Sequence, residues 1–164
     1  MIHGSSLVIF NDNSEVLLVK RRDYPIWVIP GGGIEAHESP LHAALREAEE
    51  ETGHTLKFSP PKKFAIYTLP SGKKSHFYIS QHISGKFTKN FEASEGNFFS
   101  TKNLPETFAP FQKMFIDDAI NFNGHIISRD IEPTPYSRLI YHYRHHPGIV
   151  IRFLIFRFFR KLGP

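Results

Sequence analysis

Short apolar stretches separated by turn-forming residues make up the first part of the chain. Residues 6–10 and 16–19 are two such stretches, and Asn, Asp, Asn and Ser stand between them at 11–14. Because these four residue types favour turns, the pattern predicts a β-hairpin. Residues 26–29 predict a third strand, which is followed by Pro30 and then by three consecutive glycines.

Further strands and a helix are predicted downstream. Residues 57–69 and 76–84 predict two strands around a Pro-Ser-Gly-Lys turn. Residues 87–99 predict a polar loop that runs into an apolar strand. Residues 105–123 carry apolar side chains at helical spacing and end before Gly124, so this segment is predicted to contain a helix with one buried face.

The residues after the glycines predict a helix with well-defined ends. Ser39 is a suitable N-cap, because its hydroxyl can accept a hydrogen bond from a free backbone N–H, and Pro40 suits the first helical position. Gly53 provides the left-handed residue that commonly ends a helix. Apolar residues between these limits form one stripe for packing on a sheet: Leu41, Ala44, Leu45 and Ala48.

The opposite side of this helix is acidic. Glu47, Glu50 and Glu51 stand at positions i, i+3 and i+4, so their carboxylates project from neighbouring points of one face. Like charges placed in this way repel each other unless a cation lies between them. The pattern therefore predicts a site for a hard cation such as Mg²⁺, which binds carboxylates and shares its remaining positions with water and phosphates.

The order of residues in this region resembles the Nudix box, the signature of the Nudix hydrolase family. The box consists here of Gly32, five residues, Glu38, seven residues, and Arg-Glu-Ala-Glu-Glu-Glu-Thr-Gly at 46–53. Its last position departs from the pattern, because His54 stands where a bulky apolar residue is usual. The resemblance implies an α/β fold, a Nudix-type α/β/α sandwich with a mixed β-sheet between helices.

The resemblance also implies a ligand set for the metal. Glu50 and Glu51 resemble the principal ligands, and Glu47 resembles a further ligand or the general base. A backbone carbonyl of Gly31 or Gly32 is a further candidate, since glycine lets the backbone approach closely. The implied ion is Mg²⁺, with Mn²⁺ as an alternative.

Other residues of the family's machinery can be placed in the same way. Glu38 and Arg46 resemble the pair that orients the carboxylates. The general base differs among family members, so Glu47, Glu92 and Glu95 all remain candidates. The implied reaction is metal-dependent hydrolysis of a nucleoside diphosphate linked to another moiety, as in a nucleotide sugar, a dinucleoside polyphosphate or a nucleoside triphosphate. The alternative is a Nudix-like module that binds nucleotides without cleaving them.

Substrate contacts are suggested by residues outside the acidic set. Arg21 and Arg22 can attract a polyphosphate, although a solvated strand end explains them equally well. Tyr24 can stack on a base, whereas Trp27 has apolar neighbours and fits the core better. His37 can donate a hydrogen bond to a phosphate, and an exposed loop histidine is the simpler alternative.

Composition places limits on the class of protein. With 164 residues, of which 40% are hydrophobic, the chain can form a packed domain. It contains no cysteine, which excludes disulfides and thiolate metal sites and fits a cytoplasmic location. No signal peptide is apparent at the N-terminus.

Charge divides the chain into two parts. Residues 125–164 contain seven Lys or Arg and two acids, a formal +5, so residues 1–124 carry −1 of the total of +4. We therefore expect a Nudix hydrolase domain at 1–124 and a helical, basic and aromatic extension at 125–164.

The extension has several possible partners. Residues 149–162 combine apolar and basic side chains, which fits a helix lying on a membrane surface. Burial against the domain or in a homodimer fits the apolar residues better still. Nucleic acid is the partner that we favour least.

Overall fold

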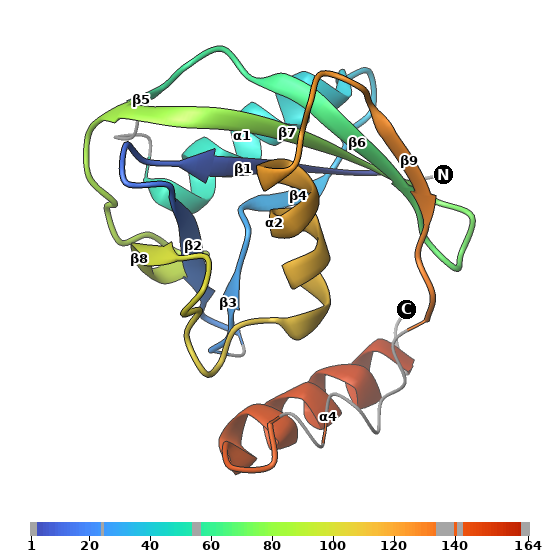
Figure 1. Ribbon diagram of the computed structural model, residues 1–164. Helices are drawn as coiled ribbons and strands as arrows, with labels where there is room; N and C mark the ends of the chain where they lie inside the picture. Colours follow the sequence, from blue (N-terminus) through green and yellow to red (C-terminus); the bar gives the residue numbers. More distant parts are fainter. Residues whose placement is uncertain (1–2, 24, 54–56, 134–139, 141–142, 162–164) are drawn as a thin grey trace.

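A mixed β-sheet forms the centre of the protein (Figure 1). The computed structural model describes residues 3–23, 25–53, 57–133, 140 and 143–161. Within them the strands are β1 (Gly4–Phe10), β2 (Glu15–Arg21), β3 (Trp27–Val28), β4 (Gly31–Gly33), β5 (Lys57–Phe58), β6 (Lys62–Thr68), β7 (Lys74–Ser84), β8 (Ala93–Ser100) and β9 (Ile127–Asp130). The helices are α1 (Pro40–Thr52), α2 (Lys113–Ile120), which a 3₁₀ turn η1 (Pro110–Gln112) precedes, and α4 (Pro147–Lys161).

Strand β1 lies in the middle of the strand order β3-β2-β1-β7-β6-β9. It pairs in parallel with β7 along its whole length and antiparallel with β2 and β4 at its two ends. The predicted hairpin of β1 and β2 is confirmed, and Asn11 forms its turn by accepting hydrogen bonds from the N–H groups of Asn13 and Glu15 at 3.0 and 2.9 Å.

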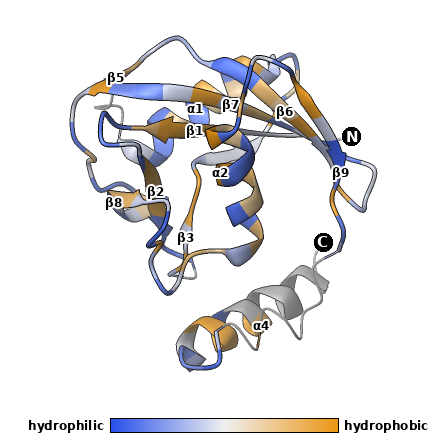
Figure 2. Cartoon of the chain, viewed as in Figure 1, coloured by the Kyte–Doolittle hydropathy of each residue, from blue (hydrophilic) through white to orange (hydrophobic). Residues whose placement is uncertain are grey.

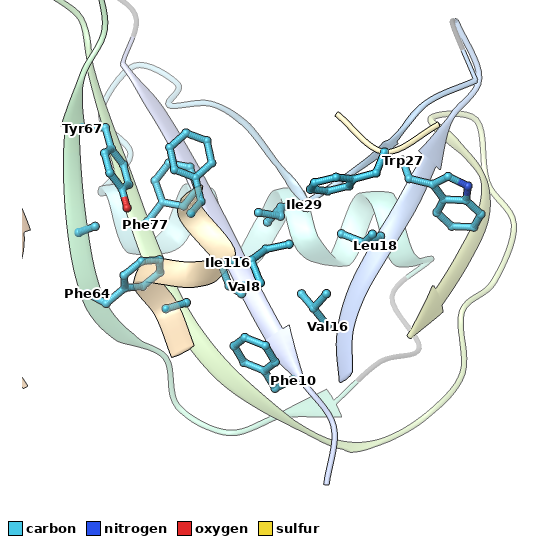
Figure 3. Packing of buried hydrophobic residues seen from close by; sticks show 14 residues of the cluster. Val8, Phe10, Val16, Leu18, Trp27, Ile29, Phe64, Tyr67, Phe77 and Ile116 are labelled. Carbon is cyan, nitrogen blue, oxygen red and sulfur yellow. The ribbon is translucent and has the colours of Figure 1, made fainter. Parts of the chain in front are cut away.

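The two faces of the sheet are covered by different helices. Side chains of β1 alternate, so Leu7 and Ile9 join a buried cluster with α1, while Val8 and Phe10 join a larger one with α2. Figure 1 shows α1 and α2 on opposite sides of the sheet, and Figure 3 shows Ile116 of α2 within the larger cluster. The arrangement confirms the expected α/β/α sandwich.

One prediction of secondary structure was wrong in part. The polar loop expected over much of residues 87–99 is replaced from Ala93 onwards by β8, which pairs antiparallel with β2. The edge of β2 supplies backbone partners that override the low strand propensity of this polar, glycine-containing segment. The helix predicted within 105–123 is confirmed as α2 with the preceding η1. It begins only after Ala109, because Thr107 and Ala109 form backbone hydrogen bonds with Trp27.

The sheet also extends beyond Gly124. Strand β9 was not predicted, and it pairs in parallel with β6 from Ile127 opposite Ala65 to Asp130 opposite Thr68. Beyond it, α4 begins at Pro147, and the figures place this helix outside the sandwich, beyond α2 and β3 (Figure 1). Helix α4 is therefore not part of the sandwich, although Ile149 packs against Val19 of β2 and Val28 of β3.

Candidate active site

The glycine strand β4 brings the backbone close to α1. Gly31 donates its N–H to Oε2 of Glu51 at 2.9 Å. A Cβ added at Gly32 would overlap the carboxylate of Glu47, and one added at Gly31 would lie 2.6 Å from the carbonyl oxygen of Ser5. Glycine is therefore required at Gly31 for β4 to fit against β1, and a side chain at Gly32 would displace the carboxylate of Glu47.

Helix α1 has the predicted ends. The hydroxyl of Ser39 accepts a hydrogen bond from a backbone N–H of the first turn at 3.2 Å. Gly53 ends the helix in the left-handed conformation, with a φ of 85°. A Cβ at Gly53 would also overlap the backbone of Thr88, so glycine is needed there for both conformation and packing.

Arg46 connects the acidic residues of the site. Its Nε and Nη2 donate to the two carboxylate oxygens of Glu38 at 3.0 and 3.1 Å. Its Nη1 donates to Glu47 and to Glu50 at 3.0 Å each, and Nη2 also donates to the carbonyl of Gly33 at 3.0 Å. The hydrogen bond from Arg46 lowers the pKa of Glu38, so this carboxylate stays ionised and keeps the guanidinium in place.

Three carboxylates converge next to Arg46. One ligand oxygen from each of Glu47, Glu50 and Glu92 lies within 4.8 Å of the other two. An octahedral ion with bonds of about 2.1 Å holds its ligand oxygens roughly 3 to 4.2 Å apart. The three carboxylate oxygens therefore need to move only slightly closer together to bind Mg²⁺. The oxygen-only donor set also fits a hard divalent cation.

Asn90 fixes the position of Glu92 and was not predicted from the sequence. Its Nδ2 donates to the carbonyl of Glu51, at the end of α1, at 3.0 Å. Its Oδ1 accepts from the N–H groups of Glu92 and Ala93 at 2.9 Å each. Asn90 thus attaches the segment before β8 to α1. A lone Asn in a polar stretch gives no sequence signal for such a role, because Asn is common in ordinary turns.

Burial raises the pKa of two carboxyls, Glu51 beside the cluster and Glu47 within it. Glu51 is only 5% exposed, and burial raises its pKa to about 8 despite the hydrogen bond from Gly31. Burial also raises the pKa of Glu47, and the hydrogen bond from Arg46 opposes this. A divalent cation would favour the ionised form of such carboxylates. Glu51 is not one of the three converging carboxylates, and its role as a ligand stays a prediction.

The two candidate carboxylates of the segment before and within β8, Glu92 and Glu95, lie in different places. Glu95 lies in β8 rather than in a loop, and its carboxylate pairs with Lys20 at 2.8 Å. Glu92 belongs to the cluster, whereas Glu95 does not. Of the two predicted loop carboxylates, only Glu92 is therefore placed to act on a metal or a water there.

The basic candidates contact protein groups. Arg21 forms two hydrogen bonds with Asp23, at 2.9 and 2.6 Å. Arg22 donates its Nε to the carbonyl of Asn90 at 2.6 Å, so it supports the segment that carries Glu92. Their contact with a substrate stays a prediction.

The structure describes one of the two aromatic candidates and one of the two histidines, Trp27 and His37. Trp27 is buried and packs edge-to-face on Phe99, which confirms its place in the core. His37 is exposed and has a φ of 67°, a left-handed conformation that favours glycine. Tyr24 and His54 lie outside the described residues.

A pocket of about 290 Å³ adjoins the glycine strand. Ser6 and Gly31 line it at the sheet, together with Ile26, Val28 and Ile29. Its far wall comes from α4 and the residues just before that helix: Ile140, Tyr143, Ile149 and Val150. Gln112, a second residue that the sequence did not reveal, also lines the pocket, and its Oε1 accepts from the N–H of Ile29 at 2.7 Å.

Known proteins resemble the chain in both sequence and fold. A Bacillus subtilis protein whose provisional name is 8-oxo-dGTP diphosphatase is 32% identical over 120 residues, which cover 72% of this chain and 79% of that protein. An ADP-ribose pyrophosphatase of Methanocaldococcus jannaschii is 29% identical over 117 residues, covering 66% and 68%. The crystal structure of an ADP-ribose pyrophosphatase from Streptococcus suis has the same fold, with a TM-score of 0.62 at 24% identity, covering 79% of this chain and 98% of that one.

The segment that matches the family covers β1 to β8, helix α1, nearly all of α2 and the carboxylate cluster. The model of the NUDIX domain matches residues 3–119, which is more than half of the chain. The matched segment begins before β1 and ends within α2, and it contains Arg46 with all the carboxylates that it holds. The chain therefore belongs to the Nudix family and is a hydrolase that acts on phosphoric anhydride bonds.

Proposed function

We propose that the protein is a metal-dependent pyrophosphohydrolase that cleaves a nucleoside diphosphate linked to another moiety, such as a sugar, a second nucleoside or a further phosphate. The convergence of Glu47, Glu50 and Glu92 carries this proposal, because their ligand oxygens lie within 4.8 Å of one another. Three carboxylates without a cation repel each other, and one guanidinium, that of Arg46, is too little to neutralise the group.

Glu47, Glu50 and Glu92 would hold Mg²⁺, with Mn²⁺ as the alternative. Glu51 and the carbonyl of Gly31 or Gly32 are further proposed ligands. When bound, the ion would withdraw charge from the phosphate oxygens and lower the pKa of a coordinated water. Arg46 keeps the carboxylates in one orientation, which avoids reorganisation during the reaction.

A carboxylate of the site must also accept a proton. When the oxygen of water attacks phosphorus, the anhydride P–O bond breaks and the water loses a proton to a base. Glu47 and Glu92 are the candidates that lie in the cluster. Burial raises the pKa of Glu47 from its ordinary value, which improves it as a base near neutral pH.

The pocket beside Gly31 supports a substrate with a nucleoside. Its volume of about 290 Å³ is near the lower end for ligand sites, which is roughly 300 Å³. Ile26, Val28 and Ile29 offer an apolar wall for a base, and Arg21 lies at the same pocket. The relatives named for 8-oxo-dGTP and ADP-ribose both act on nucleoside phosphoric anhydrides, which is the reason for proposing this class.

The test is turnover of a nucleotide panel in Mg²⁺ or Mn²⁺, comparing the native chain with Glu50→Gln. The panel contains ADP-ribose, a nucleotide sugar, a dinucleoside polyphosphate and nucleoside triphosphates. We expect at least one member to be hydrolysed and kcat to fall by roughly 100-fold or more in the variant. Glu49→Gln is the matched control, because Glu49 is exposed on the same helix and is not one of the converging carboxylates.

Two results would contradict the proposal. The first is hydrolysis that is equal in Glu50→Gln and Glu49→Gln. The second is tight binding of a nucleotide without hydrolysis of any panel member, which would favour the alternative of a nucleotide-binding module.

A further inference from the structure

Helix α4 is attached to the domain along one side. Ile149 is 6% exposed and belongs to a buried cluster with Val19, Ile26 and Val28 of the domain. Tyr143, just before the helix, is buried in the same cluster and donates its hydroxyl to the carbonyl of Phe108 at 3.0 Å. These contacts fix which side of α4 faces the domain.

A different side of α4 presents large apolar residues to solvent. Ile151, Leu154 and Ile155 are 55%, 47% and 51% exposed, respectively. Their spacing of i, i+3 and i+4 places them next to one another on one helix face. Figure 2 shows hydrophobic residues in this described part of α4, at the edge of the molecule. Exposed apolar side chains gathered in this way usually mark a contact surface.

The charge of the same segment is entirely basic. No Asp or Glu follows Glu132 in the chain, and α4 itself contains Arg152, Arg157, Arg160 and Lys161. Arg152 is exposed and lies in sequence between the exposed apolar residues. A partner for this helix must therefore combine an apolar interior with a negatively charged surface.

We propose that α4 docks on the surface of an anionic phospholipid bilayer, with Ile151, Leu154 and Ile155 inserted at the level of the acyl chains and Arg152 near the headgroups. The helix lies on the bilayer and does not cross it. Its 15 residues span only about 22 Å, and the hydrocarbon core is about 30 Å thick. No helix among the described residues is long and apolar enough to cross a membrane.

A second copy of the chain fits the same surface less well. Two α4 helices in contact would bring basic residues of both copies together, and the segment has no acid with which to pair them. An anionic lipid surface neutralises these charges and accepts the apolar residues at the same time.

Co-sedimentation with lipid vesicles tests the proposal on the full chain. The vesicles contain phosphatidylcholine alone or with about one third phosphatidylglycerol, since anionic lipid attracts basic helices. We expect binding to the anionic vesicles that weakens as salt rises. The variant Ile151→Ser/Leu154→Ser/Ile155→Ser should bind the anionic vesicles more weakly by a factor of at least about ten. Arg152→Gln should bind them roughly fivefold more weakly.

The matched control changes exposed apolar residues elsewhere. Ile83, Phe91 and Ile126 are 65%, 99% and 55% exposed and lie outside α4, so the triple serine variant at these positions should bind as the native chain does. Thermal unfolding of all variants checks that they are folded, and light scattering gives their mass without lipid.

Several results would overturn the proposal. These are native protein that does not sediment with anionic vesicles, equal binding to neutral vesicles, or equal binding of the α4 triple variant and its control. A native dimer that the α4 triple variant turns into a monomer, without vesicle binding, would assign the surface to a second copy. Binding of a single-stranded RNA oligonucleotide that depends on α4, again without vesicle binding, would assign it to nucleic acid.

Discussion

The carboxylate site and the α4 helix are held in place by opposite kinds of interaction. At the site, Arg46 donates hydrogen bonds to three carboxylates and one carbonyl, and Glu51 is buried with a raised pKa. At α4, Ile149 makes apolar contacts with the domain and Tyr143 adds one hydrogen bond beside the helix.

The carboxylate site needs neighbouring residues in exact positions, whereas α4 needs only apolar neighbours. Charged hydrogen bonds depend on direction and distance, so the site needs positioning residues such as Asn90. Apolar contacts are non-directional, so α4 can be held by few residues. We therefore expect changes at the site to alter activity and pH dependence, and changes at α4 to alter attachment and stability.

Among the changes that test this comparison, the largest effect is expected for the residue that positions Glu92, although it is smaller than that of replacing the proposed ligand Glu50. Asn90→Ala removes the hydrogen bonds to the carbonyl of Glu51 and from the N–H groups of Glu92 and Ala93. Because Glu92 then loses its fixed position, kcat/KM should fall roughly tenfold and the metal concentration for half-maximal activity should rise. A metal titration of the steady-state rate measures both.

Asn121→Ala provides the comparison for this change. Asn121 also donates its amide to a backbone carbonyl, that of Asp117, at 2.8 Å, but it lies at the end of α2. Its variant should keep the native rate and metal dependence. If the two variants behaved alike, Asn90 would have no role in positioning the site.

The helix of the site could be predicted from the sequence because its signals are local. Ser39 and Gly53 cap α1 as expected, and the acidic spacing places Glu47 and Glu50 together. Each of these features depends on residues within a few positions of one another. The hairpin of β1 and β2 was predictable for the same reason, since Asn11 forms its turn locally.

Features that depend on distant segments could not be predicted in this way. Glu92 joins the cluster because Asn90 bonds to the end of α1, a contact between residues 39 positions apart. Strand β9 exists because β6 offers it an edge. Neither polar segment has a strong propensity of its own, so tertiary partners decide its structure.

The buried carboxyl of Glu51 should make the stability of the protein depend on pH, whereas the apolar contacts of α4 should not. The pKa of Glu51 in the folded protein, about 8, lies above its ordinary value of 4.5. Between these values the folded state binds a proton that the unfolded state has lost. The stability of the metal-free protein should therefore fall as pH rises from about 5 to about 8, by at most roughly 1.4 kcal/mol per pH unit.

Glu51→Gln should reduce this slope, because its amide cannot ionise and its oxygen can still accept from Gly31. The raised pKa of Glu47 leaves a smaller slope of the same sign. Urea unfolding at several pH values measures the free energy of unfolding. Glu132→Gln, at an exposed residue after β9, should keep the slope of the native chain. A slope in Glu51→Gln as steep as that of the native chain would show that burial of this carboxyl has little effect on stability.

The smallest expected effect concerns the attachment of the extension. Tyr143→Phe removes the buried hydrogen bond to the carbonyl of Phe108, which should lower the free energy of unfolding by about 1 kcal/mol. Tyr78→Phe is the control, because Tyr78 is equally buried and belongs to the sheet, where its apolar contacts remain. If urea unfolds both variants at the same concentration, the hydroxyl of Tyr143 does not stabilise the native state. A loss of stability confined to Tyr143→Phe, at a single cooperative transition, would show that the extension unfolds together with the sheet.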